Sequence, residues 1–300
     1  MNLSGIIPPM VTPLAGRNTL DTAAIERLVE HILSGGARGL FILGTTGEGP
    51  ALSYPLRRAV VQKVCAQVRE RVPVLVCITD NAYEESLGLA RYAADVGASA
   101  VVAAPPFYWA LQRPDLEHYF LQLASDSPLP VFLYNMPSLT KIAIPVETIA
   151  RAMTHENVVG MKDSSGSLNY LHQVLRLRKD RPDWPVLVGD EETLVYAMHA
   201  GANGGVNGGA NVFPQLYSGL FNAIAAQDAQ SINRLQALIV RMGDLYRLGR
   251  GSISIISGIK QALEELGLCA ARCSEPYLPL DAIQIAGVKA LVEEIHAALP

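Results

Sequence analysis

Short apolar segments alternate with amphipathic stretches along most of the chain. Between the apolar segments, apolar residues recur with the roughly 3.6-residue period of a helix. Helix-start signals precede several of these stretches, such as Asp21 before AAIERLVEHIL and Pro145 before VETIARAM. Eight of the apolar segments have the length and composition of buried parallel strands: residues 6–11, 39–44, 73–79, 99–105, 130–135, 158–163, 185–190 and 204–208.

Eight strand–helix units within residues 1–211 predict an α/β fold, a (β/α)8 TIM barrel whose core carries the active site. Residues 212–300 have helical patterning throughout and predict a C-terminal helical extension packed on the barrel, so that the chain forms one structural unit. An open, doubly wound sheet is the structural alternative. It lacks support because no glycine-rich fingerprint follows the first strand.

Composition narrows the class of protein. Half of the 300 residues are apolar, 17% are charged and the formal net charge is −4, which favours neither disorder nor a nucleic-acid-binding surface. The N-terminus has no basic signal-peptide region, and no apolar run reaches the roughly 18 residues of a membrane helix. We therefore expect a soluble, cytoplasmic protein whose partners are small molecules and copies of itself, not nucleic acid or membrane.

Metal chemistry has little support in the sequence. Cys65, Cys77, Cys269 and Cys273 are most simply buried thiols, because no further cysteine pair or histidine gives them a ligand-like spacing. The six histidines likewise share no such spacing with carboxylates or cysteines. No metal site is predicted.

Polar residues whose side chains could take part in catalysis lie where the predicted strands end. In these barrels the carboxyl ends of the strands converge on one face, where the chemistry takes place. Tyr134 ends the fifth strand and Lys162 ends the sixth. The second strand ends in GTTGE, where Thr45 and Thr46 offer hydroxyl and amide groups to a carboxylate, and the fourth leads to a second phenol, Tyr108. These groups would surround one small cavity.

A lysine in an apolar site can attack a ketone and form a Schiff base, and an imine next to a carboxylate can yield an enamine. Each motif alone has an ordinary structural explanation: Lys162 as a surface residue paired with Asp163, Tyr134 as a packing residue, and TTG as a turn. Together they supply an electron sink, a proton shuttle and a carboxylate anchor, as carbon–carbon bond chemistry requires. No organic cofactor is needed, because the imine is itself the electron sink.

The chain resembles the dihydrodipicolinate synthase/N-acetylneuraminate lyase family of class I, Schiff-base aldolases. The matching stretches follow the order found in the family and cover the whole predicted barrel: GTTGEGPAL (44–52), PPFYW (105–109), YNMP (134–137), GMKDSSG (160–166), GDEE (189–192) and GANGGVNGGAN (201–211). In the C-terminal third only SGIKQALEELG is similar to the family.

The resemblance implies a role for each catalytic candidate. Lys162 would form the imine with pyruvate, and Tyr134 would relay protons to and from the substrate. Thr45 and Thr46 would hold the pyruvate carboxylate. Tyr108 is similar to a tyrosine that a neighbouring subunit inserts to complete a hydroxyl relay with Thr45 and Tyr134. The resemblance thus implies a homo-oligomer, a dimer of dimers.

Glycines form a second group of candidates implied by the resemblance. Gly47 and Gly189 would let the substrate approach the backbone, and Gly205 or its neighbours would present backbone carbonyls to the pyruvyl group. The GGVNGGAN run could instead bind a phosphate group, as loops after the last strands of such barrels often do.

The second substrate is predicted from a position where this chain differs from the synthase branch of the family. Where the synthase branch has an arginine that binds the second carboxylate of aspartate semialdehyde, this chain has Leu139. The lyase branch also has leucine there, and it holds sugar hydroxyls with residues matching Ser164, Glu191 and Glu192. Against this, GTTGE is closer to the synthase branch, Lys141 could supply a displaced charge, and the two glutamates could simply cap a helix.

The sequence thus predicts a pyruvate-dependent aldolase or lyase that most simply cleaves a 2-oxo-3-deoxy sugar acid or a sialate-like 4-hydroxy-2-oxo acid. One alternative is 4-hydroxy-tetrahydrodipicolinate synthase, which condenses pyruvate with aspartate semialdehyde. An alternative of a different class is a non-catalytic barrel that binds or senses pyruvate.

Overall fold

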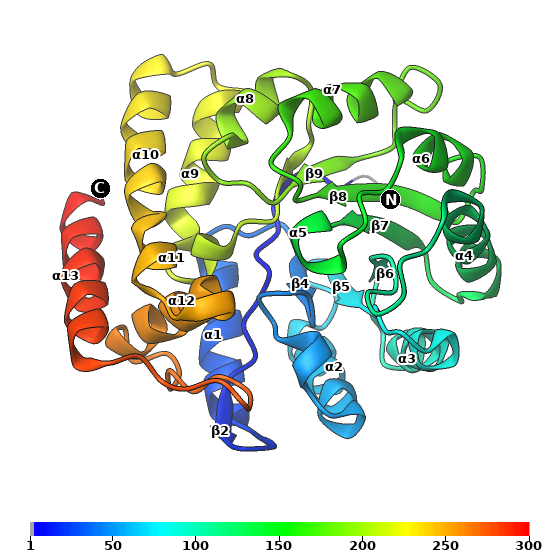
Figure 1. The fold of residues 1–300 in the computed structure, drawn as a ribbon. Coiled ribbons are helices and arrows are strands. Elements are labelled where there is room, and N and C mark those ends of the chain that lie inside the picture. Colours follow the sequence, from blue (N-terminus) through cyan, green and yellow to red (C-terminus); the bar gives the residue numbers. More distant parts are fainter. Residues whose placement is uncertain (1–2, 300) are drawn as a thin grey trace.

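Eight parallel strands curl around the centre of the molecule (Figure 1). The computed structural model describes residues 3–299. Hydrogen bonding links the strands in the order β1-β10-β9-β8-β7-β6-β5-β4. Their bounds are β1 Gly5–Ile6, β4 Leu40–Ile42, β5 Val74–Cys77, β6 Ala100–Ala103, β7 Val131–Asn135, β8 Val158–Asp163, β9 Val186–Val188 and β10 Gly204–Gly205.

The segment that follows β1 closes the sheet into a barrel. Pro9 forms an isolated parallel bridge with Phe41 of β4, the Met10 N–H donates to the Phe41 carbonyl at 2.9 Å, and the Phe41 N–H donates to the Pro8 carbonyl at 3.1 Å. Regular pairing was expected over residues 6–11, but Pro8 and Pro9 have no N–H to donate, so the ladder is interrupted there. The (β/α)8 barrel is confirmed.

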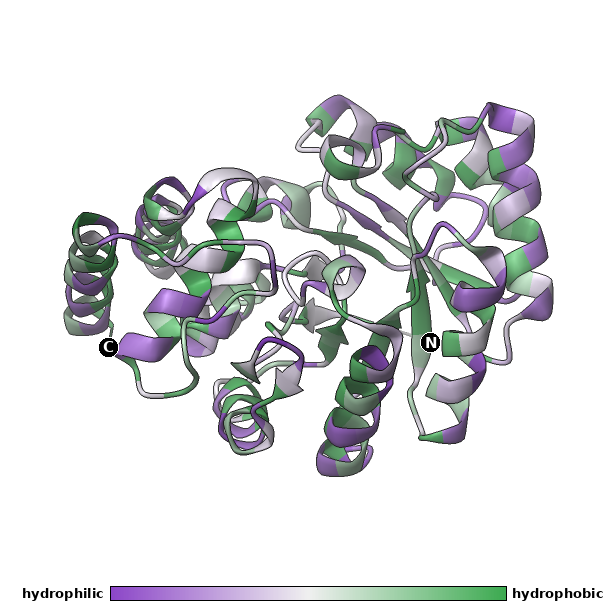
Figure 2. Cartoon of the chain, turned by 60° about the horizontal axis from the view of Figure 1, so that its bottom comes forward, coloured by the Kyte–Doolittle hydropathy of each residue, from purple (hydrophilic) through white to green (hydrophobic). Residues whose placement is uncertain are grey.

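Helices α1 to α4 and α6 to α9 cover the outside of the barrel (Figure 1). In Figure 2 these helices carry both hydrophilic and hydrophobic residues, whereas most of the central strands are hydrophobic. The first helix begins where the sequence indicates, because the Asp21 carboxylate accepts a hydrogen bond from the Ala24 N–H at 2.9 Å. The helices are α1 Thr22–Ser34, α2 Tyr54–Val68, α3 Tyr83–Asp95, α4 Arg113–Asp126, α6 Val146–Ala152, α7 Leu168–Leu177, α8 Leu194–His199 and α9 Pro214–Ala225.

Short elements lie at the ends of several strands. A hairpin of β2 (Leu14–Gly16) and β3 (Thr19–Leu20) follows β1, and helix α5 (Pro137–Thr140) follows β7. Single 3-10 turns follow β4, β10 and α11: η1 Gly49–Ala51, η2 Gly208–Asn211 and η3 Gly251–Ile253.

The C-terminal helices stand against one side of the barrel (Figure 1). They are α10 Ala229–Met242, α11 Asp244–Leu248, α12 Ser254–Glu265 and α13 Ala282–Ala298. Helix α9 contacts β1, α1 and α8, so it is the eighth helix of the barrel wall, and α12 contacts η2 at the end of β10. The division into a barrel of residues 1–211 and an extension of residues 212–300 stays a prediction.

One hydrophobic core runs from the barrel into the C-terminal helices. It includes Phe132 of β7, Tyr217 of α9 and Ile295 of α13. Cys65, Cys77 and Cys269 are buried, and all four thiols are free. Within residues 3–299, no helix has both the length and the apolar composition that crossing a membrane requires.

The close approach of β1 to β10 predicts one sensitive glycine. A side chain at Gly204, whose φ is +159°, would place its Cβ 1.9 Å from the Gly5 carbonyl oxygen, a backbone atom held by the β1–β10 pairing. Gly204→Ala should therefore lower the free energy of unfolding by more than about 2 kcal/mol, measured by urea unfolding followed by circular dichroism. The control is Gly219→Ala in α9, where the Cβ meets only Leu235 at 3.5 Å. This variant should be neutral or stabilising by up to about 1 kcal/mol. Equal stability of both variants would contradict this close approach of β1 to β10.

Candidate active site

Tyr134 and Lys162 are neighbours because β7 and β8 pair in parallel, with Tyr134 opposite Lys162. Both side chains are buried, at 3% and 6% exposure. The Lys162 Nζ lies 4.3 Å from the centroid of the Tyr134 ring and 4.8 Å from that of Phe41, and the two rings are perpendicular. The amine is thus held between two aromatic rings in a site shielded from water. Sequence reasoning missed Phe41, because an apolar residue within a strand carries no chemical signal.

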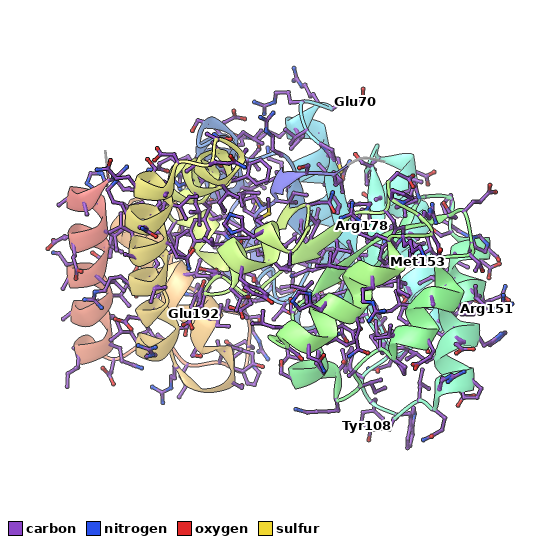
Figure 3. All side chains as sticks on the ribbon, turned by 90° about the horizontal axis from the view of Figure 1, so that it is seen from above. Glu70, Tyr108, Arg151, Met153, Arg178 and Glu192 are labelled. Carbon is purple, nitrogen blue, oxygen red and sulfur yellow. The ribbon has the colours of Figure 1, made fainter. Side chains whose placement is uncertain are left out.

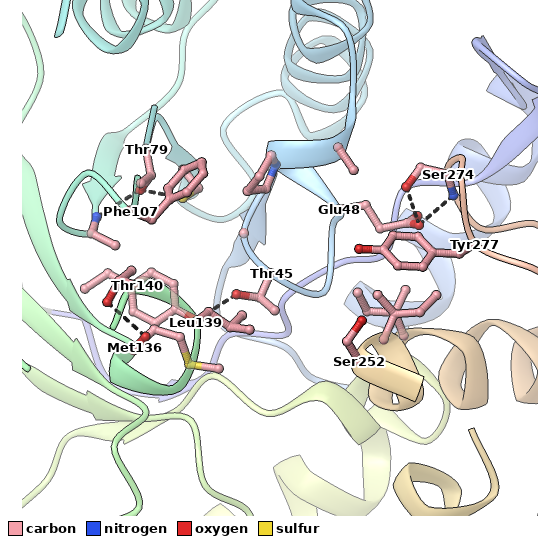
Figure 4. A pocket seen from close by; sticks show the side chains of 18 residues that line it. Thr45, Glu48, Thr79, Phe107, Met136, Leu139, Thr140, Ser252, Ser274 and Tyr277 are labelled. Atoms are coloured by element: carbon pink, nitrogen blue, oxygen red, sulfur yellow. Dashed lines mark hydrogen bonds between the residues drawn. The ribbon is translucent and has the colours of Figure 1, made fainter. Parts of the chain in front are cut away.

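The turn after β4 brings a hydroxyl to the same place. The Thr45 Oγ1 and the Tyr134 hydroxyl oxygen are 3.2 Å apart and share a hydrogen bond (Figure 4). The turn is fixed by a bond from the Glu48 N–H to the Thr45 carbonyl at 3.0 Å. Thr12 Oγ1 also donates to the carbonyl of Gly47 at 2.7 Å. Thr46 is buried in this turn. Lys162, Tyr134 and Thr45 are therefore brought together.

A cavity of about 240 Å³ opens beside these residues (Figure 4). Tyr134 and Thr45 line it, and the Lys162 amine lies against the Tyr134 ring. Part of the wall comes from the C-terminal region, which the sequence had identified only as helices packed on the barrel. The lining residues that sequence reasoning missed include Glu48, Thr79, Ser252, Ile256, Ser274 and Tyr277.

Leu139 belongs to the cavity wall, and Lys141 stands just beyond it. Leu139 is on α5 and is 46% exposed. Lys141 ends this helix with a positive φ of 62°, and its Nζ donates to the Ser138 carbonyl at 2.7 Å. In this arrangement the Lys141 ammonium binds the backbone of its own turn.

Ser164 and Gly189 lie next to the lysine. A Cβ at Gly189 would lie 2.2 Å from the Ser164 Oγ and 3.4 Å from the Lys162 Cε, so only glycine leaves room for both side chains. The alternative of a Lys162–Asp163 surface pair is wrong. Asp163 instead accepts from the Asn135 side chain at 2.9 Å and from Ser165, and burial raises the pKa of its carboxyl.

Glu191 and Glu192 have different environments. Both Glu191 carboxylate oxygens already have protein partners: the hydroxyls of Tyr217 and Tyr246, and the Gly209 N–H at 2.9 Å. The side chain is buried, and burial raises the pKa of this carboxyl. Glu192 is exposed near the C-terminal helices (Figure 3). Neither residue lines the cavity, so the arrangement does not support the expected contacts with sugar hydroxyls.

The remaining candidates also lie away from the cavity. The Gly205 carbonyl accepts the Ile7 N–H at 2.8 Å, so it is used in the β1–β10 ladder instead of facing a pyruvyl group. Tyr108 is 74% exposed at the edge of the molecule (Figure 3). The backbone N–H groups of Phe107 and Tyr108 both donate to the Asn81 side-chain oxygen at 2.9 Å, which fixes this loop.

Cys77 is the thiol nearest this chemistry, since it lines the cavity and lies 3.3 Å from the Thr79 Oγ1. Burial raises the pKa of the Cys77 thiol, which favours the protonated, weakly nucleophilic form. Across residues 3–299, no three His, Cys, Asp or Glu side chains are grouped so that they could hold a metal ion.

The chain is similar to known proteins over nearly its whole length. The model of the "Dihydrodipicolinate synthetase family" matches residues 2–295. A relative from Escherichia coli K12, named "Probable 2-dehydro-3-deoxy-D-pentonate aldolase", is 33% identical over 92% of this chain and 91% of its own.

Two solved structures are similar over nearly the whole chain. Dihydrodipicolinate synthase from Bacteroides thetaiotaomicron has a TM-score of 0.94 and 42% identity, covering 97% of this chain and 98% of its own. A prophage protein of the dihydrodipicolinic acid synthase family from Escherichia coli K12, solved in complex with pyruvate, has a TM-score of 0.93 and 27% identity, with 99% of each chain covered.

Replacing each of the two adjacent glutamates tests whether Glu191 is a buried structural anchor and Glu192 an exposed side chain. Glu191→Ala should lower the free energy of unfolding by about 2–4 kcal/mol, because the Tyr217 and Tyr246 hydroxyls would lose their buried acceptor. Glu192→Ala is the matched control and should stay within about 0.5 kcal/mol of the unmodified protein. Thermal unfolding measures both effects. If Glu191→Ala unfolds like the unmodified protein, the side chain is not the anchor described here.

Proposed function

Because the chain belongs to the dihydrodipicolinate synthetase family and is thus an enzyme of the pyruvate-aldolase type, we propose that it breaks a carbon–carbon bond through a lysine–pyruvate imine. The proposed substrate is a 2-oxo-3-deoxy sugar acid, which would yield pyruvate and a hydroxylated aldehyde. The observation that carries this proposal is the buried contact between the Lys162 amine and the Tyr134 ring, with Thr45 bonded to the same tyrosine.

The proposed reaction begins at Lys162. Its amine attacks the ketone carbon of the substrate, and loss of water gives the imine. Removal of the proton from the 4-hydroxyl then breaks the bond between C3 and C4. The aldehyde leaves, and the electron pair moves into the protonated imine to form an enamine. Protonation of the enamine at C3 and addition of water release pyruvate and restore the amine.

Tyr134 is the group best placed to carry protons in these steps. It contacts Lys162 with its ring and Thr45 with its hydroxyl, so one phenol spans the imine carbon and the carboxylate-binding turn. Thr45 and Thr46 would hold the substrate carboxylate with their hydroxyls and N–H groups. No organic cofactor or metal is needed, because the imine itself accepts the electron pair.

The polarity of the cavity supports a neutral, hydroxylated aldehyde half. Among the lining residues, all within the described part of the chain, none is Lys, Arg or His. Leu139 offers no charge, and the Lys141 ammonium is bound to the Ser138 carbonyl. The hydroxyls of Ser252 and Tyr277 point into the cavity (Figure 4). A second carboxylate would therefore be desolvated without a cationic partner, which costs free energy.

The specific alternative is synthesis of 4-hydroxy-tetrahydrodipicolinate from pyruvate and aspartate semialdehyde. Identity of 42% with a dihydrodipicolinate synthase favours it. Lys141 would then have to leave the Ser138 carbonyl and turn toward the substrate. A barrel that binds or senses pyruvate without turnover is the other alternative, and the Tyr134–Thr45 hydrogen bond argues against it because binding alone needs no proton shuttle.

The proposed assembly is a homo-oligomer, a dimer of dimers. Three adjacent aromatic residues, Phe107, Tyr108 and Trp109, are exposed on a loop that Asn81 holds in place. Exposed aromatic clusters are typical of protein interfaces. In the proposed assembly this cluster packs on a second copy, and Tyr108 completes the hydroxyl relay of the partner.

Imine formation can be trapped directly. Pyruvate with borohydride should fix one reduced adduct on the protein, Lys162→Ala should abolish it, and mass spectrometry measures the outcome. Lys63→Ala, at a partly exposed lysine paired with Glu26, is the control and should be labelled like the unmodified protein. Tyr134→Phe should still be labelled but should lose turnover by about 10²–10⁴. An adduct on Lys162→Ala would refute the assigned nucleophile.

Substrate choice separates the two catalytic alternatives. Cleavage of the best 2-oxo-3-deoxy sugar acid should exceed condensation with aspartate semialdehyde by about tenfold to hundredfold in kcat/KM, since a charge-assisted contact is worth about 1.5–3 kcal/mol. Leu139→Arg should narrow the gap. Lys141→Ala is the control and should leave the ratio unchanged. The synthase alternative is correct if the unmodified protein condenses aspartate semialdehyde at about 10⁴ M⁻¹s⁻¹ or above and Lys141→Ala removes that activity.

A further inference from the structure

A buried ion pair joins the turn after β4 to helix α12. Lys260 is fully buried at 0% exposure, and Glu48 is 3% exposed. The Lys260 Nζ donates to one Glu48 carboxylate oxygen and to the Arg272 carbonyl, the latter at 2.7 Å. The other oxygen of Glu48 accepts from the Ser274 N–H at 2.8 Å and from the Ser274 Oγ at 3.1 Å (Figure 4). Every charge in this cluster has a partner.

The turn that this pair holds is the one proposed to bind the substrate carboxylate. Two residues that are not glycine, Leu43 and Glu48, stand at its ends with positive φ values of 59° and 57°. Such conformations are unfavourable for these residues and persist only where the surroundings fix them. The Glu48 side chain supplies that fixation from its own strained position, three residues after Thr45.

The negative charge of Glu48 also affects the binding of an anionic substrate in the cavity. Glu48 lines the same cavity as Thr45 and Tyr134, and it is the one charged lining residue in the described part of the chain. Pyruvate and 2-oxo acids are anions, so an unpaired carboxylate there would repel them. Lys260 offsets this charge in the wall of the cavity.

Stability alone does not account for the pair. A buried ion pair gains little over apolar residues of similar volume, because both ions must be desolvated, whereas it can fix one arrangement of the groups around it. From this and from the strained turn, we propose that Lys260 is a positioning residue for the reaction. It holds Glu48, and through Glu48 the Thr45–Thr46 turn, and it offsets a charge that would oppose the anionic substrate. This inference rests on the proposed pyruvate chemistry.

The pyruvate concentration that gives half-maximal borohydride labelling tests this role. In Lys260→Met it should rise about tenfold to hundredfold, because the unpaired Glu48 carboxylate repels pyruvate and the turn loses its anchor. Labelling at saturating pyruvate should stay within about threefold of the unmodified protein, because the Lys162–Tyr134 contact is untouched. A merely structural role would lower the labelled fraction and leave the half-saturating concentration unchanged, and that result overturns the proposal.

Two further variants keep the test decisive. Glu48→Gln/Lys260→Met removes both charges and should recover part of the loss, leaving the half-saturating concentration about threefold to tenfold above that of the unmodified protein. If Lys260→Met does not fold, this double variant decides, and an unchanged half-saturating concentration overturns the proposal. Lys63→Met breaks the exposed pair with Glu26 and should change nothing. Absence of labelling in the unmodified protein would instead reject the proposed function itself.

Discussion

Parallel pairing of β7 with β8 puts Tyr134 and Lys162 side by side on the inner face of the barrel, and the candidate site depends on that register. A slip of one residue in either strand would turn one of the two side chains to the outer face, toward the helices. The register is protected because both strands are buried and lie between other strands of the barrel. Phe41 reaches the same amine from β4, on the far side of the hydrogen-bonded order, so barrel closure also shapes the site.

The family match and the cavity answer different parts of the functional question. The family match identifies an enzyme of the pyruvate-aldolase type, and imine formation at Lys162 is the proposed part of its chemistry. Leu139 of α5 and Ser252 and Tyr277 of the C-terminal segment line the cavity, where they would contact the aldehyde half in the proposed reaction. Relatives named as an aldolase and as a synthase match nearly the whole chain, so the shared fold does not itself select the substrate, and in the proposed function these lining residues do.

Sequence patterning predicted the barrel and the positions of Lys162, Tyr134 and Thr45, because strand periodicity is local and strand ends converge by topology. It did not reveal the Lys260–Glu48 pair, since the two residues are 212 positions apart, and the stretches that hold them, GTTGE and SGIKQALEELG, give no sign that they meet. Glu191 looked available for a ligand because its tyrosine partners, Tyr217 and Tyr246, lie in later helices. The pattern of a single sequence does not show which side chains far apart in the chain will pair.

The late position of Lys260 and Ser274 in the chain bears on synthesis at the ribosome. The strand-end residues Tyr134 and Lys162 emerge first, and domains can begin to fold while the chain is still growing. Helix α9, which covers β1, follows the last strand, and the groups that bind Glu48 emerge later still. A nascent barrel would therefore carry Lys162 and Tyr134 while the turn after β4 still lacks the groups that bind Glu48. Premature termination just after the last strand would leave a sheet with no wall behind β1 and an incomplete site.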